Sequence, residues 1–344
     1  MGIQNSKLKE HKIKELLKEN YGIEVLKAEE INRGTANIFK IYSTDNNKYI
    51  LKEFSEGRTK ESVIKETDII NFLNKKNIKV PIYIKSKLNE SYIEYENRVI
   101  ILQEFIDGYT MENNTGNHEK TIESARILGK MTKALEEYEG LSEDGIIDKW
   151  FSKESLQNGI KKMLDLQNKL NEDNPYKDTF YKDLNEKIKI SKDLEKNFDF
   201  DIIRKMTIMN AHGDYSVQQL IYQDNAETTV IDFETAKKLP IIWEVMRSYS
   251  YIDKEAKNGE LNIDTLIEYV REFSKYIKLN EYDLKYAAHI YLIQTVSSVF
   301  GYKQYNDNYE KTGLLEFAFF RTNLCRFLYK HLDEISLRLQ KEIL

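Results

Sequence analysis

Residues 211–222 read AHGDYSVQQLIY and residues 229–236 read TVIDFETA, and these two segments decide the fold. Asp214 follows a glycine in a tight turn, where its side chain can point into a cleft. Gln219 lies five residues further on and offers an amide oxygen. Asp232 interrupts an apolar run, and an ionised carboxylate in such a place requires a metal or a cation. A carboxylate that accepts a hydroxyl proton, together with hard oxygen ligands for magnesium, is the set of groups that phosphoryl transfer uses.

His212 stands beside this turn and is a proton acceptor by residue type. A histidine next to such a turn is more often a hydrogen-bonding structural group than a catalytic base. The interpretation of Asp214 as the base is therefore favoured over His212.

A lysine and a glutamate in consecutive predicted elements occupy unusual positions. Lys52 shares one face of a predicted strand with Ile50 and Phe54, and a lysine on an apolar face is costly unless it meets an anion. Glu66 lies within the apolar stripe of a predicted helix, three residues after Val63. We expect Lys52 and Glu66 to pair with each other. The alternatives are a lysine that extends from an edge strand into solvent and a glutamate at the border of a solvated face.

The segment 32–37, NRGTAN, joins two predicted strands. Small residues at Gly34 and Thr35 would let backbone N–H groups approach phosphate oxygens. An ordinary hairpin turn explains the same residues equally well. The segment contains neither the GxGxxG pattern nor a P-loop.

The first part of the chain favours strands and the remainder favours helices. Alternating apolar residues and turn residues predict strands at residues 23–26, 38–42, 49–54, 91–96 and 98–104. Apolar residues at helical spacing predict helices at residues 6–20, 60–76 and 120–138, a charged helical hairpin at 153–197, and mainly helices from 241 to 344.

This order of elements predicts the α+β class with two lobes. The expected small lobe, residues 1–104, is an antiparallel five-stranded sheet with one inserted helix. The expected large lobe, residues 105–344, is mainly helical and carries a helical insertion at about 151–197. A cleft is expected at the junction near residues 104–108.

Composition limits the classes of function. The chain has 344 residues, of which 41% are hydrophobic, and a net charge of -5. A mildly acidic chain is a poor match for nucleic acid, because phosphate backbones favour a basic surface. No apolar run is long enough for a membrane span. The single cysteine, Cys325, excludes an internal disulfide and favours a cytoplasmic location.

The His-Gly-Asp segment followed by Ile-Asp-Phe resembles the aminoglycoside phosphotransferase and choline kinase family, which has a protein-kinase-like fold. The family pattern reads His-Gly-Asp, four residues, Asn, and an Asp in an apolar strand. Here Asp232 follows Asp214 by eighteen residues, and Gln219 stands where the family has Asn. The resemblance implies that Asp214 is the catalytic base and that Asp232 and Gln219 bind Mg²⁺. Glutamine keeps the amide oxygen but adds one methylene.

The resemblance also implies a nucleotide site in the first lobe. Lys52 would contact the α- and β-phosphates and would be held by Glu66. Residues 102–108, LQEFIDG, are similar to the family's hinge, so the resemblance implies an adenine site at Gln103, Glu104, Phe105 and Ile106. Residues 240–247, PIIWEVMR, resemble the helix after the metal-binding aspartate, where Glu244 and Arg247 would have structural roles.

These features predict a small-molecule kinase that uses Mg²⁺ and ATP or GTP to phosphorylate a hydroxyl of a small acceptor. An aminoglycoside-like compound, an amino alcohol and a sugar are the candidate acceptors, of which the first two are cationic. Glu234, Asp253 and Glu255 are candidate acceptor contacts, although each is also typical of a surface acid. The main alternative is a non-catalytic relative, of the spore-coat type or a nucleotide-binding scaffold, which Gln219 motivates. A protein kinase is disfavoured because no His-Arg-Asp motif is present. The sequence leaves the oligomeric state open.

Overall fold

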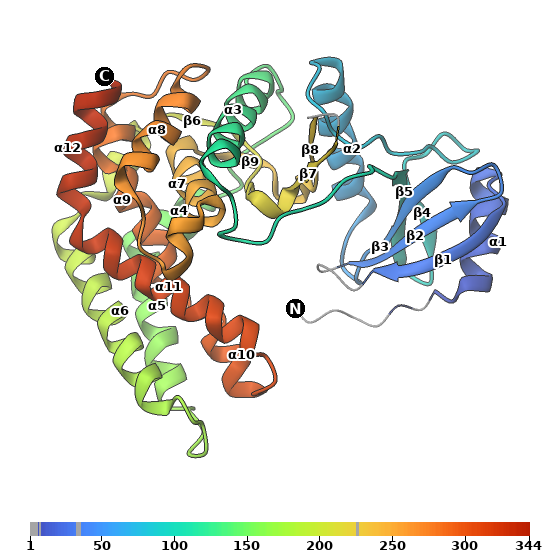
Figure 1. Cartoon of the computed structure of the whole chain (residues 1–344). Coiled ribbons are helices and arrows are strands. Elements are labelled where there is room, and N and C mark those ends of the chain that lie inside the picture. Colours follow the sequence, from blue (N-terminus) through green and yellow to red (C-terminus); the bar gives the residue numbers. More distant parts are fainter. Residues whose placement is uncertain (1–5, 7, 32–35, 225–226) are drawn as a thin grey trace. The chain divides into compact units, whose positions relative to one another are not determined.

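The structure is a computed structural model (Figure 1). It describes residues 6, 8–31, 36–224 and 227–344. Gly34 and Thr35, for which phosphate contacts are predicted, lie outside the described residues. Among the described residues, no helix is both long and apolar enough to cross a membrane.

The chain divides into two compact units (Figure 1). The first unit combines Met1–Thr110 with Gln219–Ala236, and the second combines Met111–Gln218 with Lys237–Leu344. These units do not follow the predicted lobes residue for residue, because the segment that carries Asp232 belongs to the first unit. Asp214 belongs to the second.

The first unit contains the predicted five-stranded antiparallel sheet. Its strands are β1 (Val25–Ile31), β2 (Asn37–Ser43), β3 (Lys48–Glu53), β4 (Ile93–Tyr95) and β5 (Arg98–Glu104). Their order in the sheet is β1-β2-β3-β5-β4, with antiparallel pairing throughout. The α+β fold class is therefore confirmed.

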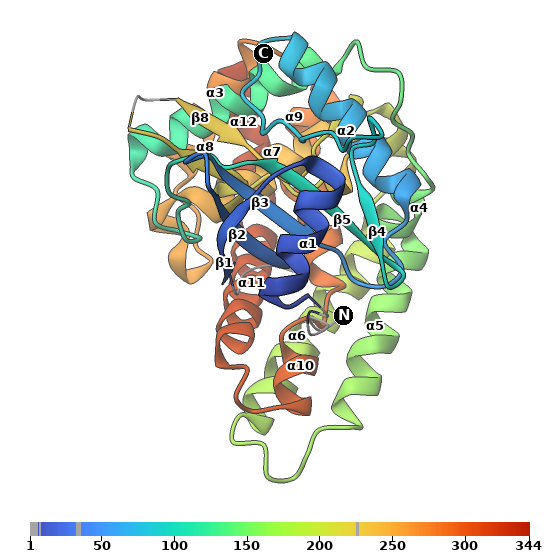
Figure 2. The same cartoon turned by 90° about the vertical axis from the view of Figure 1, so that its right-hand side faces the viewer.

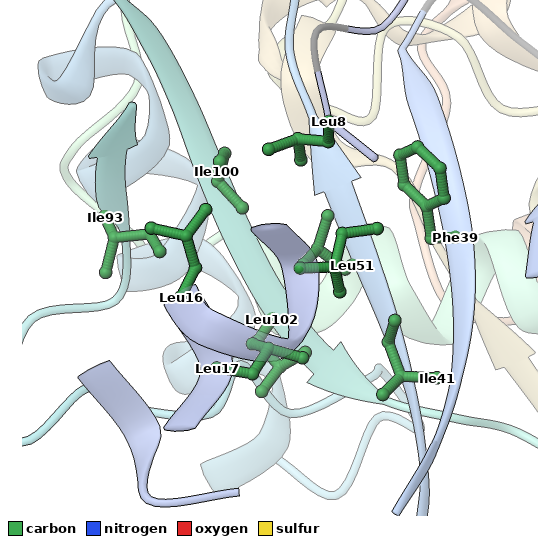
Figure 3. Close-up of a cluster of buried hydrophobic side chains, with 10 residues drawn as sticks. Leu8, Leu16, Leu17, Phe39, Ile41, Leu51, Ile93, Ile100 and Leu102 are labelled. Carbon is green, nitrogen blue, oxygen red and sulfur yellow. The ribbon is translucent and has the colours of Figure 1, made fainter. Parts of the chain in front are cut away.

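One face of this sheet packs against α1 (Glu10–Tyr21). Figure 3 shows Leu16 and Leu17 of this helix among buried side chains of the sheet, including Leu51 and Leu102. The sequence had suggested that Lys52 shares the apolar face of β3. That assignment is wrong: Leu51 belongs to the buried cluster, and Lys52 is only half-buried. Successive side chains of a strand point to opposite faces, so Lys52 faces away from this core.

The helix α2 (Lys60–Lys75) begins at Thr59, whose side chain accepts a hydrogen bond from Ser62 N. A side-chain oxygen at this position satisfies a backbone N–H that has no partner within the helix. Also in the first unit are the hairpin of β7 (Leu220–Tyr222) and β8 (Thr228–Val230), and the short 3₁₀ helix η3 (Phe233–Thr235), which contacts α2.

The second unit is mainly helical. Its helices are α3 (His118–Leu135), α4 (Ile146–Phe151), α5 (Lys153–Gln167), α6 (Lys177–Asn197), α7 (Ile241–Ile252), α8 (Ile263–Ser274), α9 (Glu281–Val296), α10 (Tyr302–Asp307), α11 (Thr312–Lys330) and α12 (Leu332–Ile343). The predicted hairpin is present: α5 and α6 lie side by side (Figure 2). Because α9 is apolar on nearly all sides, it packs against α7, α11 and α12 in the centre of the unit.

A short antiparallel pair, β6 (Ile208–Ala211) with β9 (Lys237–Pro240), completes the second unit. This pair of strands flanks the segment 212–236, which carries Asp214, Gln219 and Asp232. β6 leads directly into His212 and Gly213, and β9 leads directly into α7. The turn that carries Asp214 is therefore built between a strand and the start of a buried helix.

The core of the first unit yields a stability prediction. Leu51 is fully buried, so Leu51→Ala should lower the free energy of unfolding by about 2–5 kcal/mol, from lost burial and the cavity left behind. Leu26 is 58% exposed in the same sheet, and Leu26→Ala should change the free energy of unfolding by about 0.5 kcal/mol or less. Urea unfolding followed by circular dichroism measures both values. Equal losses in the two variants would contradict this description of the core.

Candidate active site

A buried carboxylate fixes the His-Gly-Asp turn. Glu244, at the start of α7, accepts hydrogen bonds from the backbone N–H groups of His212 (3.0 Å), Gly213 (2.6 Å) and Tyr215 (3.4 Å). Gly213 has φ of 82°, a left-handed conformation that suits glycine. Burial is the largest influence on Glu244 and raises the pKa of its carboxyl, while His212 and the Gly213 N–H oppose that rise. The structural role expected for Glu244 is thus explained.

Asp214 projects from this turn and is paired with Arg247. The Arg247 guanidinium donates to Asp214 Oδ1 and to the backbone oxygen of Tyr215, the latter at 2.8 Å. It also lies over the ring of Tyr251, 4.9 Å from the centroid. The Asp214 side chain is 42% exposed and therefore open to solvent, whereas the Arg247 side chain is only 17% exposed.

The side chain of His212, unlike that of Asp214, is not accessible to solvent. Its side chain is fully buried, and its Nδ1 accepts a hydrogen bond from the Asp214 backbone N–H at 3.3 Å. A buried ring that receives a backbone hydrogen bond is positioned to hold the turn, not to meet a substrate. This geometry agrees with the preference for Asp214 over His212.

In the first unit, the β7–β8 hairpin brings Gln219 and Asp232 to the same end of two paired strands. Leu220 pairs with Val230, and the backbone N–H of Ile231 donates a hydrogen bond to the backbone oxygen of Gln219 at 3.0 Å. Asp232 follows immediately with φ of 71°. This left-handed conformation is uncommon outside glycine and costs about 1 kcal/mol or more, which is typical of residues with functional roles.

The two side chains fit a magnesium site in chemical type. Both are half-buried, and they supply a carboxylate and an amide oxygen, which are hard ligands. Mg²⁺ commonly binds one or two protein side chains, with nucleotide phosphates and water completing its shell. Within the described ranges, no group of three or more His, Cys, Asp or Glu side chains forms a metal cage.

The predicted pairing of Lys52 with Glu66 is not present. Glu66 is 3% exposed, and its two oxygens accept from Arg58 Nη2 (2.7 Å) and Tyr83 Oη (2.8 Å). No ion pair to Lys52 is found in the part of the chain that the structure describes. No pattern in the sequence points to Arg58 or Tyr83, because both lie outside the regular helices and strands, on either side of α2.

The predicted hinge residues have different surroundings. Gln103 is buried, and its side-chain oxygen has no hydrogen-bond partner among the described residues. Two hydrogen bonds join Glu104 to Ile82. The Ile82 N–H donates to Glu104 Oε1 at 2.8 Å, and the Glu104 N–H donates to the Ile82 backbone oxygen at 3.0 Å. The ring of Phe105 lies 4.0 Å from Lys40 Nζ. Ile106 is half-buried, and no hydrogen bond to its backbone is found within the described ranges.

The second unit contains a cavity of about 540 Å³ beside the segment that carries Asp214. Acidic, amide and aromatic side chains line it, together with one lysine: Glu112, Gln218, Lys257, Glu316, Phe317 and Phe320. The ring of Phe317 stacks on Tyr251 with centroids 6.0 Å apart, and Tyr251 in turn lies under Arg247. The sequence did not single out Glu112, Glu316 or Phe317, because nothing local distinguishes them from surface residues.

Of the candidate acceptor contacts, Asp253 is neither a surface acid nor available to a ligand. It is buried, and its oxygens accept from the Tyr249 hydroxyl at 2.6 Å and from the Glu255 N–H at 3.0 Å. These contacts cap a short 3₁₀ helix. Glu255 accepts from Asn262, and Glu234 pairs with Arg58 in the first unit.

Comparison with known proteins identifies the family. The family model described as "Phosphotransferase enzyme family" matches residues 27–269. No curated protein matches the sequence.

Among solved structures, the chain is similar to a spectinomycin phosphotransferase in complex with ADP and spectinomycin, with 16% identity, a TM-score of 0.65, and coverage of 98% of this chain and 100% of that one. It is similar to an aminoglycoside phosphotransferase from Alicyclobacillus acidocaldarius, with 14% identity, a TM-score of 0.65, and coverage of 97% and 98%. For a choline kinase from Cryptosporidium parvum Iowa II, identity is 12%, the TM-score is 0.54, and coverage is 92% and 93%.

At these identities, the solved structures establish the fold alone, and they confirm the predicted two-lobed kinase-like architecture. The family model matches well over half of the chain and includes both aspartate segments. The resemblance expected from the His-Gly-Asp segment is confirmed: the chain belongs to the phosphotransferase enzyme family of small-molecule kinases.

Proposed function

We propose that this chain transfers the γ-phosphate of ATP or GTP to a hydroxyl of a small, cationic acceptor, with Asp214 as the base. The observation that carries the proposal is the arrangement at the His-Gly-Asp turn. A half-exposed carboxylate is held there by an arginine whose side chain is 17% exposed, on a turn that a buried glutamate fixes. A positioned carboxylate that accepts the hydroxyl proton is the part of phosphoryl transfer that the protein must supply.

The other groups have electrostatic roles. Lys52, half-buried on β3, would contact the α- and β-phosphates. Asp232 and Gln219 would hold Mg²⁺, which when bound offsets the negative charge of the phosphates. Arg247 keeps Asp214 oriented without taking its place, because the guanidinium stays protonated at all relevant pH values. Catalysis of this kind comes mostly from positioning and fixed charge.

The nucleotide would bind along the segment after β5. Ile106 has a backbone without a hydrogen bond among the described residues, and this backbone is suited to meet the edge of a purine base. The solved relatives support a nucleotide co-substrate, since one was crystallised with ADP and an amicoumacin kinase with AMP-PNP and Ca²⁺.

Gln219 is the departure from the family pattern, and it motivates the alternative of a non-catalytic nucleotide-binding relative. The extra methylene adds roughly 1.5 Å of reach. The hydrogen bond from Ile231 to the Gln219 backbone fixes the main chain beside Asp232. The longer side chain would therefore have to fold back to present its oxygen to a metal ion held by Asp232.

The cavity lined by Gln218, four residues after Asp214, is the proposed acceptor site. Glu112 and Glu316 give it acidic character, and the rings of Phe317 and Phe320 offer faces for cation–π contact. An acceptor that carries amines, such as an aminoglycoside or an amino alcohol, matches both features. A sugar without amines matches only the polar residues.

The base assignment predicts that Asp214→Asn lowers kcat by about 10²–10⁴-fold, because the amide cannot accept the hydroxyl proton. Nucleotide binding should persist in this variant. Turnover of ATP and GTP against aminoglycosides, choline-like amines, sugars and homoserine provides the measurement. Asp148→Asn is the matched control, since Asp148 is also an exposed aspartate paired with an arginine, Arg204. Full turnover by Asp214→Asn would show that another group is the base.

The proposed acceptor site predicts that removing one of its acidic charges changes KM but not kcat. Glu316→Gln should raise the KM for a cationic acceptor by about 5–10-fold, as expected for the loss of one partly exposed charged contact, with kcat within about twofold. Glu310→Gln, an exposed glutamate outside the cavity, should leave both unchanged. Steady-state kinetics with an accepted substrate and its neutral analogue test this. An unchanged KM for the cationic acceptor in Glu316→Gln would place the acceptor elsewhere.

A further inference from the structure

The partner of the buried Glu66 is an arginine that also reaches a second acid. Arg58 Nη2 lies 2.7 Å from Glu66, and its Nη1 lies 3.1 Å from Glu234. The Arg58 side chain is 11% exposed, and its guanidinium lies over the ring of Phe54 at 5.0 Å. A guanidinium held on two carboxylates and one aromatic face has a single well-defined position.

The two acids that Arg58 joins come from different elements. Glu66 is in α2, where Tyr83 occupies its other oxygen. Glu234 is in η3, two residues after Asp232, and α2 and η3 are in contact. Arg58 therefore connects a helix of the first unit directly to the turn that presents Asp232.

The charges around Arg58 explain why a cation is needed here. Glu66 and Glu234 contact opposite terminal nitrogens of its guanidinium, at 2.7 Å and 3.1 Å. Glu234 is also only two residues from Asp232 along the chain. Without a cation between them, Glu66 and Glu234 would repel each other, and the Arg58 guanidinium offsets that repulsion.

We propose that Arg58 is a positioning residue that bridges Glu66 and Glu234 and so fixes the turn that presents Asp232 to Mg²⁺. The bridge takes the place of the lysine–glutamate pair expected at Glu66 and leaves Lys52 available for phosphate. The role toward Mg²⁺ rests on the proposed function; the bridge itself does not. Lysine cannot replace Arg58 here, because one ammonium lacks the planar fork that spans two carboxylates.

The test compares two conservative variants. In Arg58→Lys, the Mg²⁺ concentration that gives half-maximal binding of a non-hydrolysable ATP analogue should rise about tenfold or more, as for other residues that support a metal ligand. Arg98→Lys is the matched control: Arg98 is also buried in the first unit and pairs with Glu53 at 3.3 Å, far along the chain from Asp232. That variant should lower the thermal midpoint without changing the Mg²⁺ requirement.

An unchanged Mg²⁺ requirement in Arg58→Lys would overturn the role toward the metal ligand, as would an equal rise in Arg98→Lys. If the wild-type chain binds no nucleotide at any Mg²⁺ concentration, the proposed function is wrong, and so is the role of Arg58 toward the metal ligand. The contact of Arg58 with Glu66 and Glu234 can still be tested in that case, by a measurement that needs no ligand.

That measurement is a double-mutant cycle in thermal stability without nucleotide or Mg²⁺. Arg58→Lys and Glu234→Gln each break the same contact, so the shift in Tm of the double variant should be clearly smaller than the sum of the single shifts. Additive shifts would show that Arg58 and Glu234 do not interact and would overturn the bridge. Both variants keep the size of the side chain close to the original, so the fold should survive.

Discussion

Three backbone N–H groups converge on the buried carboxylate of Glu244, and the geometry of the His-Gly-Asp turn depends on this contact. A carboxylate taken out of water costs several kcal/mol unless hydrogen bonds replace its hydration. The turn at His212–Tyr215 supplies those bonds in the same conformation that leaves the Asp214 side chain partly exposed. Glu244 and the turn therefore determine each other, and Arg247, one helical turn along α7, then holds the aspartate that emerges.

The first unit repeats this principle with different residues. Glu66 is buried and touches no proposed ligand, yet it holds Arg58, which reaches the turn after Asp232. In each unit a buried glutamate and an arginine lie close to an aspartate for which we propose a role in the site. The two aspartates themselves are only half-buried, whereas Glu244 and Glu66 are buried.

Much of the fold could be predicted from the sequence, because it depends on local patterns. The five strands, α2, the α5–α6 hairpin and the family itself follow from apolar periodicity and from the His-Gly-Asp and Ile-Asp-Phe segments. The assignment of Lys52 to the core face of β3 failed because a short strand with apolar residues on both faces does not reveal which face is packed. Leu51 and Lys52 are adjacent, and only the position of α1 distinguishes them.

The contacts of the site were harder to predict, because they join residues far apart in the sequence. A prediction from the regular elements alone pairs Lys52 with Glu66. Arg58 and Tyr83 lie in irregular segments, where no periodicity indicates the direction of a side chain. Asp253 is similar: its burial depends on Tyr249 and on the cap of a short 3₁₀ helix.

The central claim is that Asp232 and Gln219 complete a magnesium-dependent nucleotide site despite the longer glutamine side chain. Calorimetric titration of the chain with a non-hydrolysable ATP analogue, with and without Mg²⁺, tests it most directly. The account predicts that binding tightens markedly when Mg²⁺ is added and that Asp232→Asn removes this gain while leaving the Mg²⁺-free binding intact. Equal affinity with and without Mg²⁺ in the wild-type chain would contradict it.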